Sequence, residues 1–252
     1  MSICYFDAFS GISGDMTVGA LADAGADRDA IVAALASLNT GATFGFEPVR
    51  RNGIAATKFV VDGGEQRAHR HLPQILKMIA DAELPEDARQ KANSVFTRLG
   101  EAEAQVHGVP IEKVHFHEVG AADSICDIVA ACLALSLLQV ERVYSSPINT
   151  GHGTVNTQHG LLPVPAPATA RLLAGVPVFA RGPALELTTP TGAALISVLA
   201  SGFGPLPAMA LRSAGYGAGD YDFPEHASVL RVLIGDVHDA AGRHYGDAGH
   251  GD

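Results

Sequence analysis

The stretch ICYFDAFSGISGDMTVGALADAG, residues 3–25, contains a strand pattern, a glycine-rich loop and a helix pattern in immediate succession. Residues 3–9 are mostly apolar and predict a buried strand. Residues 16–24 have the spacing of an amphipathic helix that ends at Gly25. This order favours an α/β or α+β fold in which a mixed sheet is flanked by helices.

The remaining elements follow from the same kind of pattern. Helices are predicted at residues 28–38, 72–82, 85–106 and 123–139, from about 167 to 175, and after 189–191. Strands are predicted at 43–49, 55–61, 114–119, 142–148 and 229–234. The dipeptide Asn52-Gly53 is a strong hairpin signal between the strands predicted at 43–49 and 55–61. Residues 149–167 predict a loop-rich connection.

The chain is expected to form one ordered region, residues 1–235, followed by a polar, glycine-rich and flexible tail at 236–252. A division into two subdomains would fall near 62–72 or 149–165. No internal repeat is evident.

Composition limits the classes of function. Hydrophobic residues make up 47% and charged residues 17% of the 252 residues, which is ordinary globular chemistry. The formal net charge of −10 opposes binding to nucleic acid. An odd number of cysteines, 3, without a CxxC pair indicates a reducing compartment. No signal peptide is evident, and the apolar stretch at 128–138 is too short to cross a membrane, so we expect a cytoplasmic protein.

Two His-x-His elements are candidate metal ligands. In an extended backbone, side chains two residues apart share a face, so each element could present two imidazoles together. Phe116 would then point to the core. Imidazole suits nickel, zinc, copper and iron, and nearby carboxylates could complete such a site. The alternative is that these are exposed polar loop residues or helix caps. The candidate ligands are His69, His71, His115, His117 and Glu118.

The loop at residues 7–15 lies between the first strand and the first helix, where backbone N–H groups favour an anion. It is neither a Walker A loop nor a GxGxxG fingerprint. Either its carboxylates hold Mg²⁺ against a phosphate, or the loop only makes a turn and a helix cap. Residues 187–193, LTTPTGA, place threonine hydroxyls at the start of a later helix, where they either cap the helix or bind an anion. The candidate phosphate-binding residues are Asp7, Ser10, Gly11, Ser13, Gly14, Asp15, Thr189 and Thr191.

Asp123 and Asp127 are spaced i, i+4 and share one face of an apolar helix. They are either solvated acids at a helix start or a functional carboxylate pair. His152 and His159 lie in a glycine-rich stretch, where a ligand and a bystander are equally plausible. These residues alone indicate a metal- or phosphate-handling α/β protein.

Longer strings say more than these motifs. In order along the chain they resemble successive blocks of the LarC family of nickel-insertion enzymes. They are YFDAFSGISGDM (5–16), HRHL (69–72), VHFHEVGAADSICDIV (114–129), HGLLPVPAPATARLL (159–173), ELTTPTGAAL (186–195) and GYGAGDYDFPEHASVLRV (215–232).

The resemblance implies insertion of nickel into a pyridinium-3,5-bisthiocarboxylic acid mononucleotide, with CTP and a divalent metal, Mg or Mn. The product would be the nickel-pincer cofactor of lactate racemase, its recipient. On this basis the histidines and Glu118 would hold nickel, and the serine- and threonine-bearing helix starts would hold the phosphate. Asp123, Asp127 and His159 are the candidate catalytic groups, since an acid or imidazole must accept the proton that the ring carbon loses.

Three departures from the family pattern matter. Ala8 stands where many relatives have Cys, and His152 stands where a small residue is usual. The family also continues into a C-terminal domain associated with CTP, whereas this chain ends in the polar tail. The chain is either the first piece of a two-piece protein, a truncation or a paralogue with a changed function. We expect CTP to be handled by a separate C-terminal domain or polypeptide. A homo-oligomer is compatible with the sequence. A non-enzymatic nickel metallochaperone and a metal-dependent nucleotide phosphohydrolase remain as alternatives.

Overall fold

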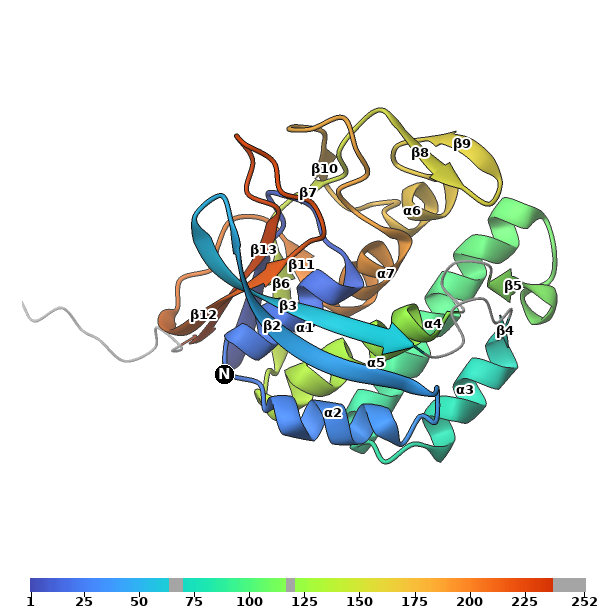
Figure 1. Cartoon of the computed structure of the whole chain (residues 1–252), viewed down its shortest axis with the longest axis horizontal. Coiled ribbons are helices and arrows are strands. Elements are labelled where there is room, and N and C mark those ends of the chain that lie inside the picture. The colour runs from blue at the N-terminus through green and yellow to red at the C-terminus, as the bar shows by residue number, and fades with distance from the viewer. Residues whose placement is uncertain (64–69, 117–120, 238–252) are drawn as a thin grey trace, which may run out of the picture.

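A computed structural model describes residues 1–63, 70–116 and 121–237 (Figure 1). Seven strands form a mixed sheet in the order β11-β6-β1-β13-β12-β3-β2. Helices flank this sheet, which confirms the predicted α/β architecture. The predicted tail falls mainly on residues 238–252, which lie outside the described residues, as do 64–69 and 117–120.

The buried strand β1 (Ser2–Asp7) lies near the middle of the sheet. It runs parallel to β6 (Arg142–Ser145) and antiparallel to β13 (Val229–Asp236). Beyond β6 lies the parallel strand β11 (Ala200–Phe203). On the other side, β12 (Ala210–Ala218) is antiparallel to β13. Segments from the beginning, middle and end of the chain therefore meet at β1.

The other edge of the sheet is a long hairpin. Strands β2 (Ala42–Arg51) and β3 (Ile54–Gly63) are antiparallel and connected at Asn52 and Gly53. Both turn residues have positive φ, +49° and +80°, as a type I′ turn requires. The hairpin predicted from this dipeptide is confirmed.

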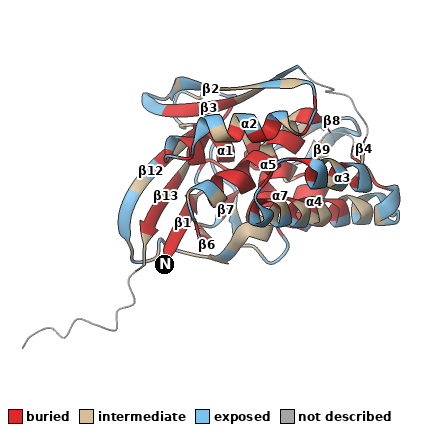
Figure 2. Ribbon diagram, turned by 90° about the horizontal axis from the view of Figure 1, so that it is seen from below, coloured by how far each residue is buried: buried red, intermediate tan, exposed pale blue. Residues whose placement is uncertain are grey.

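Helix α1 (Gly14–Asp23) lies where the sheet curves, so that β12 and β3 both pack on it. Figure 2 shows β2 and β3 lying over α1 and α2 (Arg28–Ala36). Contact with β12 is close enough to require glycine there. A Cβ at Gly217 would lie 1.8 Å from the Met16 carbonyl oxygen, and one at Gly215 would lie 2.1 Å from that of Ala20.

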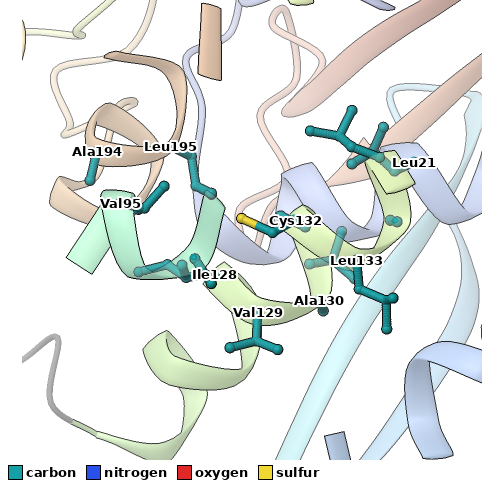
Figure 3. Packing of buried hydrophobic residues seen from close by; sticks show 14 of the residues in the cluster. Leu21, Val95, Ile128, Val129, Ala130, Cys132, Leu133, Ala194 and Leu195 are labelled. Carbon is teal, nitrogen blue, oxygen red and sulfur yellow. The ribbon is translucent and has the colours of Figure 1, made fainter. Parts of the chain in front are cut away.

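Helix α5 (Ala122–Leu137) is the centre of the core. Figure 3 shows Ile128, Cys132 and Leu133 of α5 among side chains of its neighbours. These neighbours are α1, α4 (Glu86–His107) and α7 (Pro190–Leu199). Helices α3 (Leu72–Asp81) and α6 (Pro167–Leu172) pack against α4. Among the described helices, none is long and apolar enough to cross a membrane.

The smaller elements include most of the differences from prediction. The strand predicted at 142–148 is two strands in different sheets, β6 and β7 (Ile148–Asn149), which pairs with β10 (Val178–Phe179). Pro147 lies between them and has no N–H to continue the ladder. The stretch predicted to be loop-rich contains a hairpin of β8 (Thr154–Thr157) and β9 (Gly160–Pro163). Strands β11 and β12 were not predicted, because glycine and serine weaken their strand pattern.

Candidate functional site

The starts of α1, α5 and α7 lie around one cleft of about 280 Å³. A Cβ at Gly14 would lie 2.4 Å from an Asp127 carboxylate oxygen, so α1 and α5 touch at this point. The Thr189 N–H donates to the Ile12 carbonyl oxygen at 3.1 Å, which joins the start of α7 to the loop before α1. The cleft is lined by Ser13, Gly14, Asp15, Asp123, Ser124, Asp127, Glu186, Thr189, Pro190 and Thr191.

Ser13 is the N-cap of α1. Its hydroxyl accepts a hydrogen bond from the Met16 N–H at 3.4 Å and donates one to the Asp15 carboxylate. Asp15 is also paired with Lys58 of β3 at 3.0 Å, and Lys58 reaches Asp220 at 2.6 Å. Burial lowers the pKa of the Lys58 ammonium, but the attraction of the two carboxylates outweighs this effect and the pKa is raised. Lys58 therefore stays charged and offsets part of the acidity beside the cleft.

The start of α7 is built in the same way. Thr189 is the N-cap and accepts a hydrogen bond from the Gly192 N–H at 3.2 Å, with Pro190 in the first turn. Both helix starts thus aim N–H groups and a hydroxyl at one space, a geometry that suits an anion. The capping interpretation and the anion-binding interpretation are compatible here, because further backbone N–H groups remain in each first turn.

Asp123 and Asp127 lie on the same side of the cleft, as their spacing predicted. Burial raises the pKa of Asp127 well above its usual range, and the negative charges of Asp15 and Asp123 add to the rise. A carboxyl group with a raised pKa is a stronger proton acceptor than an ordinary aspartate once it is ionised. Asp127 therefore keeps its proton to a higher pH than an ordinary aspartate does.

A smaller cavity of about 100 Å³ continues the cleft past Ser13, Asp15, Glu186 and Thr189. Its other walls are Ser10, Met16, Leu185, Leu187, Gly219, Asp220, Tyr221 and Ser228. The buried Ser10 hydroxyl is hydrogen-bonded to Nε2 of His226 at 2.7 Å. Burial lowers the pKa of His226, so this imidazole is neutral near pH 7.

Two predicted phosphate-binding residues have other contacts. Asp7 is ion-paired with Arg231 of β13, whose Nε donates to it at 3.1 Å, and it lines neither cavity. Gly11 has a φ of +82°, and a Cβ there would lie 2.0 Å from the Leu187 carbonyl oxygen. Its backbone position accounts for glycine without reference to a ligand.

The two His-x-His elements are partly described. Strands β4 (Arg70–His71) and β5 (His115–Phe116) pair antiparallel, with His71 opposite His115. Nδ1 of His71 is 3.0 Å from the Val114 carbonyl oxygen, and Phe116 is fully buried, as predicted. His69, His117 and Glu118 lie outside the described residues. Elsewhere, in residues 1–63, 70–116 and 121–237, no three His, Cys, Asp or Glu side chains are arranged to hold a metal ion.

Burial raises the pKa of the Cys126 thiol of α5 to about 12. The three thiols, Cys4, Cys126 and Cys132, are free and buried.

His159 lies in a separate cavity of about 240 Å³ between α4, the β8–β9 hairpin and the start of α6. Its ring is 5.0 Å from that of His107, which approaches Glu103 at 3.4 Å. Pro190 borders this cavity as well as the cleft. The structure thus separates His159 from Asp123 and Asp127 by the start of α7.

Several residues that line the cleft or the smaller cavity, or that contact their lining, were not singled out from the sequence. Glu186, Asp220, Tyr221 and His226 stand inside two of the blocks that resemble the LarC family, so those blocks were the available signal. Lys58 had no such signal, because it lies in an ordinary strand pattern and its partner Asp15 is 43 residues away in the sequence.

Fold and cleft together define a class: an α/β protein with an acid- and hydroxyl-lined cleft where three helices begin. The family model described as nickel insertion protein matches residues 4–248, and the chain belongs to this family, LarC. It is 47% identical over 247 residues to the pyridinium-3,5-bisthiocarboxylic acid mononucleotide nickel insertion protein of Geobacillus kaustophilus, covering 94% of this chain and 60% of that protein.

Other relatives agree with this assignment. A protein of the same name from Desulfitobacterium hafniense is 46% identical over 95% of this chain and 60% of its own length. A putative nickel insertion protein from Citrifermentans bemidjiense is 50% identical over 96% of this chain and 63% of its own length. The chain thus spans about three fifths of the length of these curated relatives. No solved structure matches it.

Proposed function

We propose that this chain takes part in the insertion of nickel into pyridinium-3,5-bisthiocarboxylic acid mononucleotide. The observation that carries the proposal is its 47% identity, over 94% of its length, to a relative named for that activity. The cleft supports it, because it combines two helix starts suited to a phosphate with a carboxylate group suited to a cation and a proton.

In this proposal Ni²⁺ is a substrate. It forms bonds to two thiocarboxylate sulfurs and to one ring carbon, and that carbon loses its proton. Ser13 and Thr189, with the N–H groups of the helix starts that they cap, orient the phosphate. Asp127, once it has released its own proton, accepts the proton from the ring carbon; burial and the charges of Asp15 and Asp123 raise its pKa.

We further propose that CTP, with Mg²⁺ or Mn²⁺, is bound by the part of the relatives that this chain does not match, and that lactate racemase receives the product. The cleft supports this division, because Lys58, the cation whose ion pairs lie beside it, is engaged by Asp15 and Asp220. A triphosphate generally needs several cations.

The test uses the purified chain with NiCl₂ and the mononucleotide, with and without CTP and the complementary C-terminal portion of a relative. We expect a product heavier than the mononucleotide by one nickel less two protons, detected by mass spectrometry. Nickel binding without mononucleotide binding would instead indicate a metallochaperone. Phosphate release from varied nucleotides without nickel would indicate a phosphohydrolase.

A further inference from the structure

The loop between β12 and β13 carries an exposed pair of aromatic rings. The rings of Tyr221 and Phe223 are 5.7 Å apart and only 16° from parallel. Tyr221 is 53% exposed, although burial of an aromatic ring is normally favourable. One face of the phenol ring is covered by Phe223, and much of the remainder is open to solvent.

This pair is anchored through His226 to the loop after β1. Phe223 packs edge-on against the imidazole of His226 at 6.2 Å, and the two residues also form an isolated β-bridge. His226 is hydrogen-bonded to Ser10, in the loop after β1, and contacts Phe9 at 5.9 Å. The loop is therefore fixed to the segment that leads into α1.

Tyr221 also lines the smaller cavity together with Ser10, Ser13 and Asp15. Asp220, its neighbour in sequence, is tied to Lys58 at 2.6 Å. The exposed ring thus borders the cavity that opens into the acidic cleft of Asp123 and Asp127. Both parts of the combined space contain carboxylates, and the aromatic ring of Tyr221 lines the smaller cavity only.

We propose that the exposed face of Tyr221, backed by Phe223, is the stacking surface for the pyridinium ring of the substrate, with nickel entering from the cleft that Asp123 and Asp127 line. This inference rests on the proposed function for the identity of the ring. A positively charged, electron-poor ring is attracted to the negative face of a tyrosine. A neutral, non-planar dihydropyridine ring lacks that attraction, so Tyr221 selects the oxidised, cationic form.

The test measures binding of two commercial probes, nicotinamide mononucleotide and its reduced form, which differ in ring charge. The chain has no tryptophan and 5 tyrosines, so tyrosine emission is observed directly. Stacking on a pyridinium ring quenches that emission. The dissociation constants of both probes are to be confirmed by calorimetry for the unaltered chain and for Tyr221→Phe, Tyr221→Ala and Leu211→Ala.

The unaltered chain should bind the oxidised probe more tightly than the reduced one, and Tyr221→Ala should remove about 5- to 30-fold of affinity for the oxidised probe only. Tyr221→Phe, which keeps the ring, should retain both affinity and preference. Leu211→Ala removes an equally exposed side chain from β12 and should change neither. If Tyr221→Ala lowers the melting temperature, the same measurements are made with Tyr221→Leu, which also removes the aromatic ring.

Equal binding of both probes to the unaltered chain, or unchanged binding after Tyr221→Ala, overturns the stacking proposal. The binding assay contains no nickel and no CTP. Tyr221-dependent binding without nickel insertion would therefore contradict the proposed function alone. Nickel insertion that persists unchanged in Tyr221→Ala would contradict the stacking surface alone.

Discussion

Asp127 is the residue whose chemistry the structure alters most. It lies against Gly14 at the start of α1, with the charges of Asp15 and Asp123 close by. Its pKa is raised in the folded protein, so the folded state holds a proton that the unfolded chain has released. Stability therefore falls as the pH rises from the unfolded pKa of an aspartate, about 4, through the folded pKa.

The first prediction concerns Asp127→Asn. Removing the ionisable group should raise the melting temperature at pH 7 and flatten the fall of stability above pH 4. A rise of about 2–4 °C corresponds to about 1 kcal/mol in a chain of this size. Nickel insertion should be lost in the same variant. Calorimetric melting between pH 4 and 8 checks the first effect, with Asp222→Asn as the control. If the melting temperature of the variant depended on pH as that of the unaltered chain does, ionisation of Asp127 would not destabilise the protein.

Gly14 has a packing contact that the sequence did not reveal. It was a candidate phosphate-binding residue or part of a turn, and the structure places the Asp127 side chain against it. A Cβ at Gly14 would lie 2.6 Å from the Cβ of Asp127, and neither atom can rotate away. Packing between α1 and α5 is thus sufficient to require glycine.

We therefore expect Gly14→Ala to lower the free energy of unfolding by about 1–3 kcal/mol, as overpacking generally does. Gly45→Ala is the matched control, since a Cβ at Gly45 in β2 meets no atom within 4 Å. Urea denaturation of both variants measures the difference. If the two variants were equally stable, packing against Asp127 would not explain why residue 14 is glycine, and close approach of a ligand would remain as the explanation.

At the scale of elements, the pairing of β4 with β5 could not be read from local pattern. Each strand has only two described residues, and 43 residues separate His71 from the carbonyl that it contacts. Periodicity predicts that an extended His-x-His element has a face, but not which distant element lies beside it. The structure shows which element lies beside it, because His71 of β4 is paired with His115 of β5.

The pairing makes a prediction for nickel. Replacing His71 and His115 together with Ala should weaken Ni²⁺ binding by about tenfold or more, through the loss of two imidazole ligands. His152→Ala is the control, because that exposed histidine is engaged by the Gly182 carbonyl oxygen at 3.1 Å. Calorimetric titration with NiCl₂ measures the affinity of each folded variant. Retention of full affinity in the double variant would exclude the paired strands as the nickel site.

Helices were predicted more closely than strands. The start of α2 and the hairpin turn at Asn52 were predicted to the residue, because caps and turn dipeptides act locally. Strand β12 was missed because its glycines serve α1, a partner almost 200 positions earlier in the chain. The spacing of Asp123 and Asp127 predicted that they share a face of α5. The ion pair of Lys58 with Asp15 depends on tertiary structure and could not be predicted from local sequence.

At the scale of the whole molecule, the chain contains the groups proposed to bind the phosphate and to accept the proton. It nevertheless spans only part of the length of its relatives. The chain aligns with 60% of the Geobacillus kaustophilus protein. We expect this chain alone to bind Ni²⁺ or the mononucleotide without CTP-dependent insertion.

Adding the complementary C-terminal polypeptide should restore activity. Activation of apo lactate racemase by the purified components measures this, with the C-terminal polypeptide alone as the control. Full CTP-dependent activation by the present chain on its own would place the CTP site among its own residues.

The position of β1 also has a consequence for how the protein is made. Its partners are β6 and β13, and β13 ends at Asp236, close to the end of the described chain. On the ribosome, β1 is therefore made long before its partner β13. At the usual elongation rate of about 5–20 residues per second, the delay is roughly 10 to 45 s. During that interval β1 lacks one of its two partner strands, although β6 and the β2–β3 hairpin are made earlier. A nascent chain of this protein is thus a natural client for chaperones that shield exposed strands.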